Sequence, residues 1–94
     1  MLAMTTEQLA PLDVSPSAIG VLDLADRDIP YVDLTSAAYP HAVLSVAGLE
    51  YTFQRSFPVK GYGAVMPAVI DELLGAGKRI LVAERSERYY VYVA

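Results

Sequence analysis

A short turn with two glycines and a lysine directly precedes a helical pattern in this chain. Lys60, Gly61 and Gly63 stand just before an apolar stripe with helical spacing. Free N–H groups at a helix start, together with a nearby lysine, attract anions. These residues are therefore a candidate anion-binding turn, although the segment lacks the complete phosphate-loop motif. The alternative interpretation is that the glycines only allow the chain to turn sharply.

His41 is the single histidine, and it follows Pro40 where a loop leads into a strand pattern. Imidazole titrates near neutral pH and can act as a general base. One hypothesis is therefore an enzyme or ligand pocket built from His41, Tyr39, Lys60 and Tyr62. The alternative is a surface or capping histidine. Because the chain has no cysteine and no second histidine, thiolate and paired-histidine metal sites are excluded, and we predict no catalytic residue, metal or cofactor.

Carboxylates are dense in one short segment, which contains Asp23, Asp26, Asp28 and Asp33. Oxygens converging from one loop can hold Ca²⁺, but this spacing lacks the central glycine and the distal glutamate of a calcium loop. Solvated turn carboxylates are the favoured interpretation. The whole chain has a net charge of −4, which disfavours nucleic acid as a partner.

The end of the chain mixes arginines with tyrosines, namely Arg79, Arg85, Arg88, Tyr89, Tyr90 and Tyr92. Aromatic rings beside guanidinium groups bind single-stranded nucleic acids, so a weak nucleic-acid binder is a further alternative. Glu84 and Glu87 lie among the arginines and cancel much of their field. A β-hairpin with a salt-bridged turn explains the same residues.

The length and the apolar content indicate one folded domain. The chain has 94 residues, of which 54% are hydrophobic, enough for a single modest core. Residues 1–17 show little periodicity, so we predict a flexible arm there and one domain over residues 18–94. No apolar run is long enough for a membrane span or a signal peptide, which predicts a cytoplasmic protein without a membrane partner.

Apolar spacing predicts the elements of this domain. An apolar stripe with a period near 3.6 predicts one amphipathic helix over residues 65–75. Alternation predicts a hairpin of residues 42–46 and 49–54 around Ala47-Gly48. Further strands are expected at residues 19–24, 29–34, 79–84 and 89–93.

The resulting fold is α+β, with an antiparallel sheet of about six short strands in the order β-β-β-β-α-β-β and the helix packed on one face. Pro30 cannot donate a ladder hydrogen bond, so its strand lies at an edge of the sheet or begins only after Pro30.

The favoured function is a small non-catalytic association module, either a homodimer or an accessory subunit of a larger assembly. The predicted interface residues are those of the last strand, Tyr89, Tyr90, Val91, Tyr92 and Val93. Neither face of this strand is polar, and one helix covers only one face of a sheet. A second copy would supply the missing cover most simply, so the expected partner is the protein itself or an unidentified protein.

Overall fold

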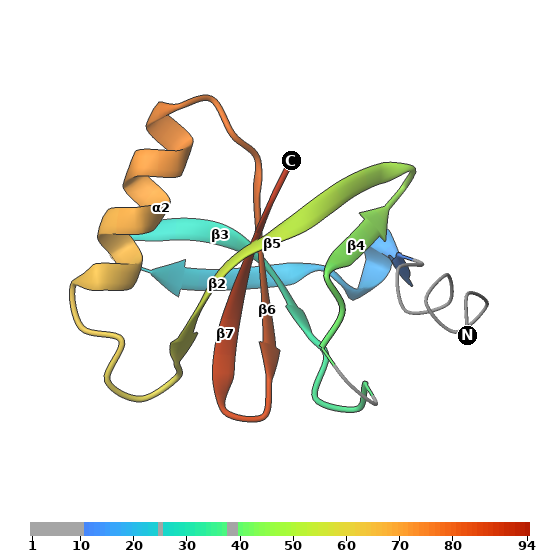
Figure 1. Cartoon of the computed structure of the whole chain (residues 1–94), viewed down its shortest axis with the longest axis horizontal. Helices are drawn as coiled ribbons and strands as arrows, with labels where there is room; N and C mark the ends of the chain where they lie inside the picture. The colour runs from blue at the N-terminus through green and yellow to red at the C-terminus, as the bar shows by residue number, and fades with distance from the viewer. Residues whose placement is uncertain (1–10, 25, 38–39) are drawn as a thin grey trace, which may run out of the picture.

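The computed structural model describes residues 11–24, 26–37 and 40–94. Within these residues, one sheet holds all the strands, in the order β1-β4-β5-β7-β6-β3-β2, and a single α-helix lies at one side of it (Figure 1). In chain order the elements are β1 (Leu12–Val14), the 3₁₀ turn η1 (Pro16–Ala18), β2 (Gly20–Leu24), β3 (Arg27–Asp33), β4 (Val43–Val46), β5 (Leu49–Pro58), α2 (Val65–Gly75), β6 (Ile80–Arg85) and β7 (Arg88–Val93).

Helix α2 has the bounds expected from its apolar spacing. Its buried residues Met66 and Ile70 are four positions apart, so both side chains lie on the face that meets the sheet. They belong to a core that we call the helix-side cluster, whose buried members are Leu24, Ile29, Phe57, Met66, Ile70, Ile80, Val82 and Val91. The expectation of an α+β fold with one helix is confirmed.

The two predicted hairpins are present, and both have tight two-residue turns. Ala47 and Gly48 join β4 to β5 with positive φ angles of 51° and 85°. Ser86 and Glu87 join β6 to β7 with φ angles of 54° and 61°. Paired positive φ values match the right-handed twist of the flanking strands. Alternation and turn chemistry therefore located these hairpins from local signals alone.

The sheet differs from the expected one in strand number and in direction. It has seven strands instead of about six, and two of its six pairings are parallel, β1 with β4 and β3 with β6. Strand β1 has only three residues, too few to show alternation. The parallel pairs join segments that are distant in sequence, and strand alternation carries no information about which distant strand becomes the neighbour.

The ends of the sheet approach each other, so the sheet is strongly curved. Seven strands laid flat would hold β1 and β2 about 29 Å apart. Only six residue steps lead from Val14 to Gly20, and these span at most about 20 Å. Curvature is therefore required by the chain itself, and the strands curve around the second face of the sheet (Figure 1).

This second face carries its own core, which we call the strand-side cluster. Its buried members are Val14, Val32, Leu44, Leu81, Ala83 and Tyr92. Side chains alternate between the two clusters along β6. Ile80 and Val82 point to the helix-side cluster, whereas Leu81 and Ala83 point to the strand-side cluster. The premise that this face has no cover within one chain is thus corrected, because the curved sheet covers it with its own strands.

The segment expected to be an arm contains described structure from residue 11 onward. Strand β1 pairs with β4 in the register Leu12↔Leu44 to Val14↔Val46, and Val14 is 7% exposed. Ser15 caps η1 by accepting a hydrogen bond from the Ser17 N–H. The first ten residues lie outside the described residues, so the proposed division into arm and domain stays a prediction.

Pro30 lies within β3, which is an internal strand between β2 and β6. Pairing of β3 with β6 begins only at Tyr31↔Val82. The next backbone hydrogen bond toward the start of β3 would need an N–H group from Pro30, and proline has none. Both alternatives derived from Pro30 are therefore wrong, because β3 is an internal strand and already begins at Arg27. Only its pairing with β6 begins after Pro30.

Candidate functional site

The predicted interface strand β7 lies at the centre of the sheet, between β5 and β6. Val91 and Tyr92 are 0% and 1% exposed, so in the folded chain they present no surface to a partner. Tyr89, Tyr90 and Val93 are half-buried and pack against the two clusters. Strand β7 has no free edge that a second copy could extend.

Tyr92 is fixed in the strand-side cluster by its ring and by its hydroxyl group. The hydroxyl donates a hydrogen bond to the His41 carbonyl oxygen at 2.5 Å, and the ring lies edge-on to Phe53 at a centroid distance of 5.9 Å. Burial disfavours the phenolate and raises the pKa of Tyr92 to about 12. This tyrosine therefore serves the core of the chain and not its surface.

Of the expected pocket members that the structure describes, neither Lys60 nor Tyr62 lies with His41. His41 lines a small apolar hollow with Pro40, Ala42, Phe53 and Tyr90. Tyr62 lies on the opposite, helix-covered face, where it packs against Tyr89 with ring centroids 6.0 Å apart. Tyr89 and Tyr90 are consecutive on β7 and point to opposite faces, so the sheet separates His41 from Tyr62. Tyr39 lies outside the described residues.

The Lys60, Gly61 and Gly63 turn precedes α2 as expected. Gly61 and Gly63 have φ angles of 90° and 59°, a region that favours glycine. Both glycines are thus explained by the sharp turn. Lys60 is exposed, and anion binding at this turn stays a prediction.

The C-terminal arginines and tyrosines are distributed over two faces of the sheet. Arg85 donates to the carbonyl oxygen of Ala37 at 3.2 Å, and Arg88 donates to the Ser56 hydroxyl at 3.0 Å. Tyr89 belongs to the helix-side face, whereas Tyr90 and Tyr92 belong to the other. No single surface combines these side chains as the nucleic-acid hypothesis requires.

Glu84 interacts with tyrosines on the helix-side face of the sheet. The Tyr31 hydroxyl donates to Glu84 Oε1 at 2.6 Å. Burial, this hydrogen bond and the negative charge of Glu84 all raise the pKa of Tyr31. Burial, and secondarily the same charge, raises the pKa of Tyr89. Glu84 is therefore engaged within the fold and does not simply neutralise the neighbouring arginines.

One edge of the sheet lies at β2, and the other lies at β1. Val21 faces Pro30 in the β2–β3 register, and because Pro30 has no N–H this is a non-hydrogen-bonded pair. By the alternation of an antiparallel ladder, Val21 and Asp23 direct their N–H and C=O groups outward. Val21 is 66% exposed, the most exposed large hydrophobic side chain among the described residues. This strand, which we call the β2 edge, combines unpaired backbone groups with exposed apolar surface.

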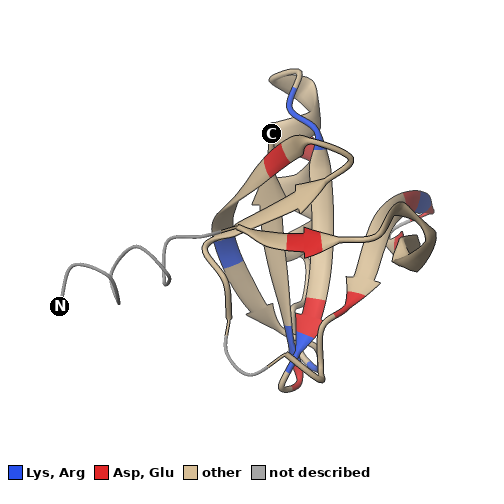
Figure 2. Cartoon of the chain, turned by 90° about the vertical axis from the view of Figure 1, so that its right-hand side faces the viewer, with Lys and Arg blue, Asp and Glu red and all other residues tan. Residues whose placement is uncertain are grey.

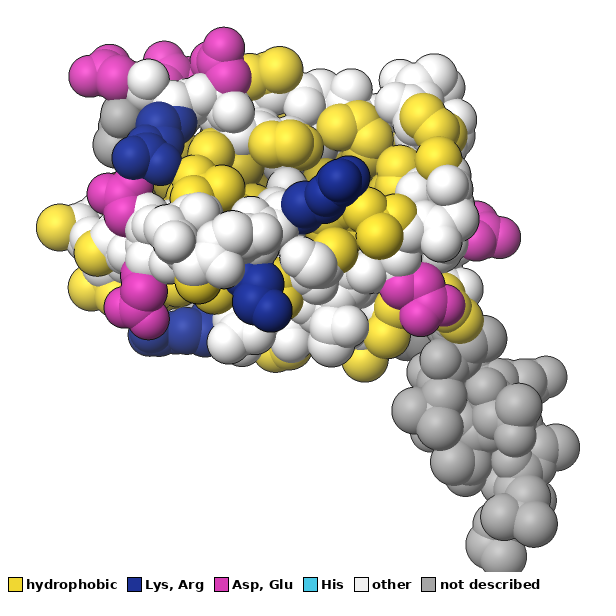
Figure 3. Space-filling model, turned by 90° about the horizontal axis from the view of Figure 1, so that it is seen from above, with side chains coloured by type: hydrophobic (Ala, Val, Ile, Leu, Met, Phe, Trp, Pro, Cys, Tyr) yellow, Lys and Arg dark blue, Asp and Glu magenta, His cyan; other side chains and the backbone are white. Residues whose placement is uncertain are grey.

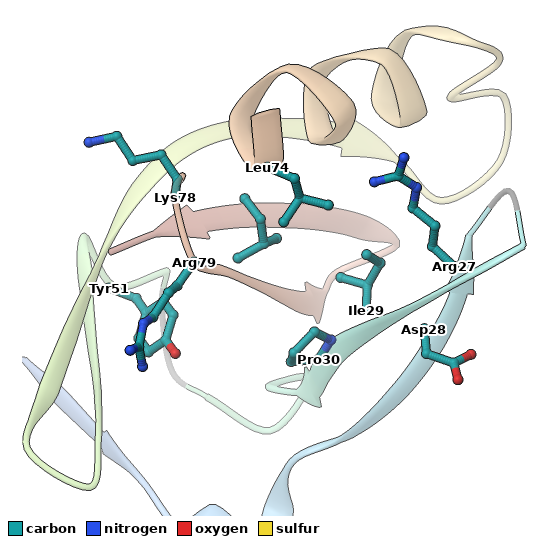
Figure 4. A pocket seen from close by; sticks show the side chains of 9 residues that line it. Arg27, Asp28, Ile29, Pro30, Tyr51, Leu74, Lys78 and Arg79 are labelled. Atoms are coloured by element: carbon teal, nitrogen blue, oxygen red, sulfur yellow. The ribbon is translucent and has the colours of Figure 1, made fainter. Parts of the chain in front are cut away.

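A second surface feature, which we call the cleft, lies between β3 and the start of β6. It has a volume of about 690 Å³. Figure 4 shows Arg27 at one end, Lys78 and Arg79 toward the other, and Ile29, Pro30 and Leu74 between them. The complete lining is Arg27, Asp28, Ile29, Pro30, Tyr51, Leu74, Lys78, Arg79 and Ile80.

The turn after α2 positions the basic end of the cleft. Gly77 has a φ angle of 81°, its N–H bonds to the Leu74 carbonyl, and the Lys78 N–H bonds to the Leu73 carbonyl, each at 3.0 Å. This is a Schellman motif, which reverses the chain directly after a helix. Arg79 then pairs with Ala94 through both backbone groups, each at 3.0 Å. The backbone at this end is thus held by the helix end and by the sheet.

The opposite end is held by an ion pair between β3 and α2. Arg27 contacts Asp71 at 2.7 Å, which joins the β2–β3 ribbon to the helix. Among the described residues no ion pair involves Lys78 or Arg79, and both are exposed. Figure 2 shows this basic segment beside the C-terminus, and Figure 3 shows hydrophobic side chains gathered around basic ones on the same face.

Sequence reasoning did not find the cleft or the β2 edge. Of the cleft residues, Asp28 belongs to the acidic segment, and Leu74 lies within the range 65–75 that predicts the helix. Two signals were present in the sequence: a proline within a strand pattern and a basic pair between a helix stop and a strand. Neither signal specifies that β3 and β6 are neighbours, and the cleft depends on that contact.

Comparison of the chain with protein-family models, curated proteins and solved structures finds no match. Within residues 11–24, 26–37 and 40–94, no helix is long and apolar enough to cross a membrane. In the same ranges no three histidine, aspartate or glutamate side chains gather as a metal site would require.

Proposed function

We propose that this protein is a small association module that forms a homodimer through the β2 edge. The observation that carries the proposal is Val21, which is 66% exposed on an edge strand with outward-facing backbone groups. An edge of this kind is a template for pairing with another strand. The interface is therefore proposed at β2 and not at the last strand, because β2 has a neighbour on one side only and carries the exposed Val21.

A two-fold axis at Leu22 suits the outward groups of this edge. In an antiparallel pairing centred there, Val21 faces the partner's Asp23, and the two residues exchange both backbone hydrogen bonds. The axis repeats this exchange on its other side. The result is one continuous sheet through both copies, with Val21 covered at the junction.

The acidic residues of β2 and β3 favour an antiparallel pairing of β2 with the β2 of a second copy over a parallel one. Asp23 already faces Asp28 across the β2–β3 pair, and like charges directly opposite destabilise a sheet. The antiparallel register places Val21, and not another carboxylate, opposite Asp23. The antiparallel register also separates the acidic ends of the β2–β3 pair in the two copies, where Asp23 and Asp28 lie. A parallel pairing would bring these ends together.

The test compares the same substitution at two exposed valines. Val21→Lys places a charge on the edge, a common protection against strand pairing, whereas Val65→Lys changes an exposed residue at the start of α2. Light scattering after gel filtration should give about twice 10.2 kDa for the wild type and for Val65→Lys. Val21→Lys should give a mass near 10.2 kDa.

Added salt should strengthen the dimer, because each copy carries a net charge of −4 and salt screens the repulsion between copies. A wild-type mass that stays at 10.2 kDa across micromolar concentrations would disprove the proposal. So would a dimer that survives Val21→Lys.

A further inference from the structure

The cleft has a basic end and an apolar floor in a chain that is acidic overall. Its lining includes three of the seven lysines and arginines of the whole protein, and only one of the eleven acids. The net charge of the chain is nevertheless −4. The charge of this surface is therefore opposite in sign to that of the molecule.

The positive charge is concentrated at one end. Arg27 is compensated by Asp71 at 2.7 Å, whereas Lys78 and Arg79 are exposed and form no ion pair with the described residues. Both follow the C-terminus of α2 directly, where the helix dipole favours cations. An acidic group can therefore approach them without displacing an existing ion pair.

The apolar part of the cleft lies beside this basic end. Leu74 is 36% exposed, while Ile29 and Ile80 are 3% and 4% exposed and form a closed floor. Pro30 is exposed along one side. A volume of about 690 Å³ lies within the range of ligand sites, but Pro30 and Leu74 leave the cleft open to solvent. Such a surface suits a chain segment that lies across it.

We propose that the cleft binds an extended acidic segment of a partner protein, with a carboxylate at Lys78 and Arg79 and an apolar side chain over Leu74 and Pro30. Charge complementarity selects this occupant. A second copy placed symmetrically on the same face would bring two linings of the same, mostly basic charge together. Nucleic acid is disfavoured as an occupant because Asp28 lines the cleft, and Asp23 on β2 lies directly opposite Asp28. These two carboxylates would repel phosphate groups.

Three blocked six-residue peptides can test this proposal on the whole isotope-labelled chain. The first alternates glutamate with valine, the second lysine with valine, and the third glutamate with serine. The glutamate–valine peptide should shift the amide signals of Leu74, Lys78, Arg79 and Ile80. Its affinity should fall as salt is raised, because the exposed charges are screened. The other two peptides should bind at least tenfold more weakly.

The matched variants are Arg79→Glu in the cleft and Arg55→Glu, which changes an exposed arginine above the Phe57 ring. Arg79→Glu should weaken binding of the glutamate–valine peptide at least tenfold, and Arg55→Glu should leave it unchanged. Equal binding of the lysine–valine or glutamate–serine peptide would overturn the proposal. It would also fail if Arg55→Glu weakened binding as much, or if no signal moved at millimolar peptide. Tighter binding of a short single-stranded oligonucleotide would overturn it as well.

Peptide binding in the cleft does not depend on formation of the dimer. Val21 is not among the residues that line the cleft, so Val21→Lys should retain peptide binding within about twofold. A monomeric wild type that binds the glutamate–valine peptide would disprove the dimer and support the cleft. A dimeric wild type that does not bind this peptide would support the dimer and disprove peptide binding in the cleft.

Discussion

Strands β2 and β7 share one sequence feature but differ in position, because β2 lies at an edge of the sheet and β7 at its centre. Each alternates so that apolar side chains lie on both faces, and each has five or six residues. Strand β7 has a neighbour on either side, and its Tyr92 is 1% exposed. Strand β2 has a neighbour on one side only, and its Val21 is 66% exposed.

The difference shows that apolar content on two faces does not identify an interface. In β7 it reflects a strand buried between the helix-side and strand-side clusters. In β2 only Leu22 and Leu24 face the helix-side cluster, and Val21 remains outside both cores. What distinguishes the strands is their position in the sheet order, which depends on distant pairings.

The largest contrast is expected when the same charge is introduced into both strands. Tyr92→Lys would bury an ammonium group among apolar side chains and remove the hydrogen bond to His41. We expect a loss of about 5 kcal/mol or more in the free energy of unfolding, enough to unfold most of a domain this small. Val21→Lys should change that free energy by less than about 0.5 kcal/mol. Urea unfolding followed by circular dichroism measures both values.

Equal stability of these two variants would contradict the central position of β7. Tyr92→Phe serves as the control for the shape of the side chain, because it retains the ring and removes only the hydroxyl group. In the same experiment it should lose only about 1 kcal/mol, because only the hydrogen bond to the His41 carbonyl oxygen is removed.

A smaller effect is expected when β1 is removed from the other end of the sheet order. A chain that begins at Ser17 lacks Leu12 and Val14, and Val14 is 7% exposed beside Leu44 in the strand-side cluster. Losing this cover should cost about 2–4 kcal/mol and lower the melting temperature by about 10 °C or more.

The control for this truncation is a chain that begins at Pro11, which removes the first ten residues and leaves β1 intact. It should melt close to the full-length protein. If both truncations melted alike, β1 would not contribute to the core, and the expectation of a flexible arm over residues 1–17 would be supported.

Local signals in the sequence predicted a substantial part of this fold. The helix at residues 65–75 followed from one apolar stripe, and the hairpin turn at Ala47 and Gly48 followed from the alternation on either side. Each depends on residues close together in the chain. The α+β class and the packing of a helix on one face followed from these elements.

The remaining features depend on contacts between distant segments. The three residues of β1 have no periodicity that reveals a strand, and the parallel pair of β3 with β6 joins Tyr31 to Val82 across the chain. The cover of the strand-side face and the cleft both result from such pairings. The strand order is the reason why the dimer is proposed through β2 and not through the last strand.

The smallest effect concerns alkaline pH and tests the burial of Tyr92 without unfolding the chain. In an unfolded chain tyrosine ionises near its usual pKa of 10, whereas burial raises the pKa of Tyr92 to about 12. The folded chain therefore holds its proton more tightly between these values. Stability is full below about pH 10 and falls as pH rises toward 12, by up to about 2–3 kcal/mol from this group.

Tyr92→Phe should remove this part of the pH dependence. At pH 7 the variant should be about 1 kcal/mol less stable, because the hydrogen bond to the His41 carbonyl is lost. Between pH 10 and 12 its unfolding free energy should decline less steeply than that of the wild type, although Tyr31 and Tyr89, whose pKa values are also raised, retain some slope. Parallel curves for the two proteins would mean that Tyr92 ionises as freely when folded as when unfolded, and β7 would then be as open to water as β2.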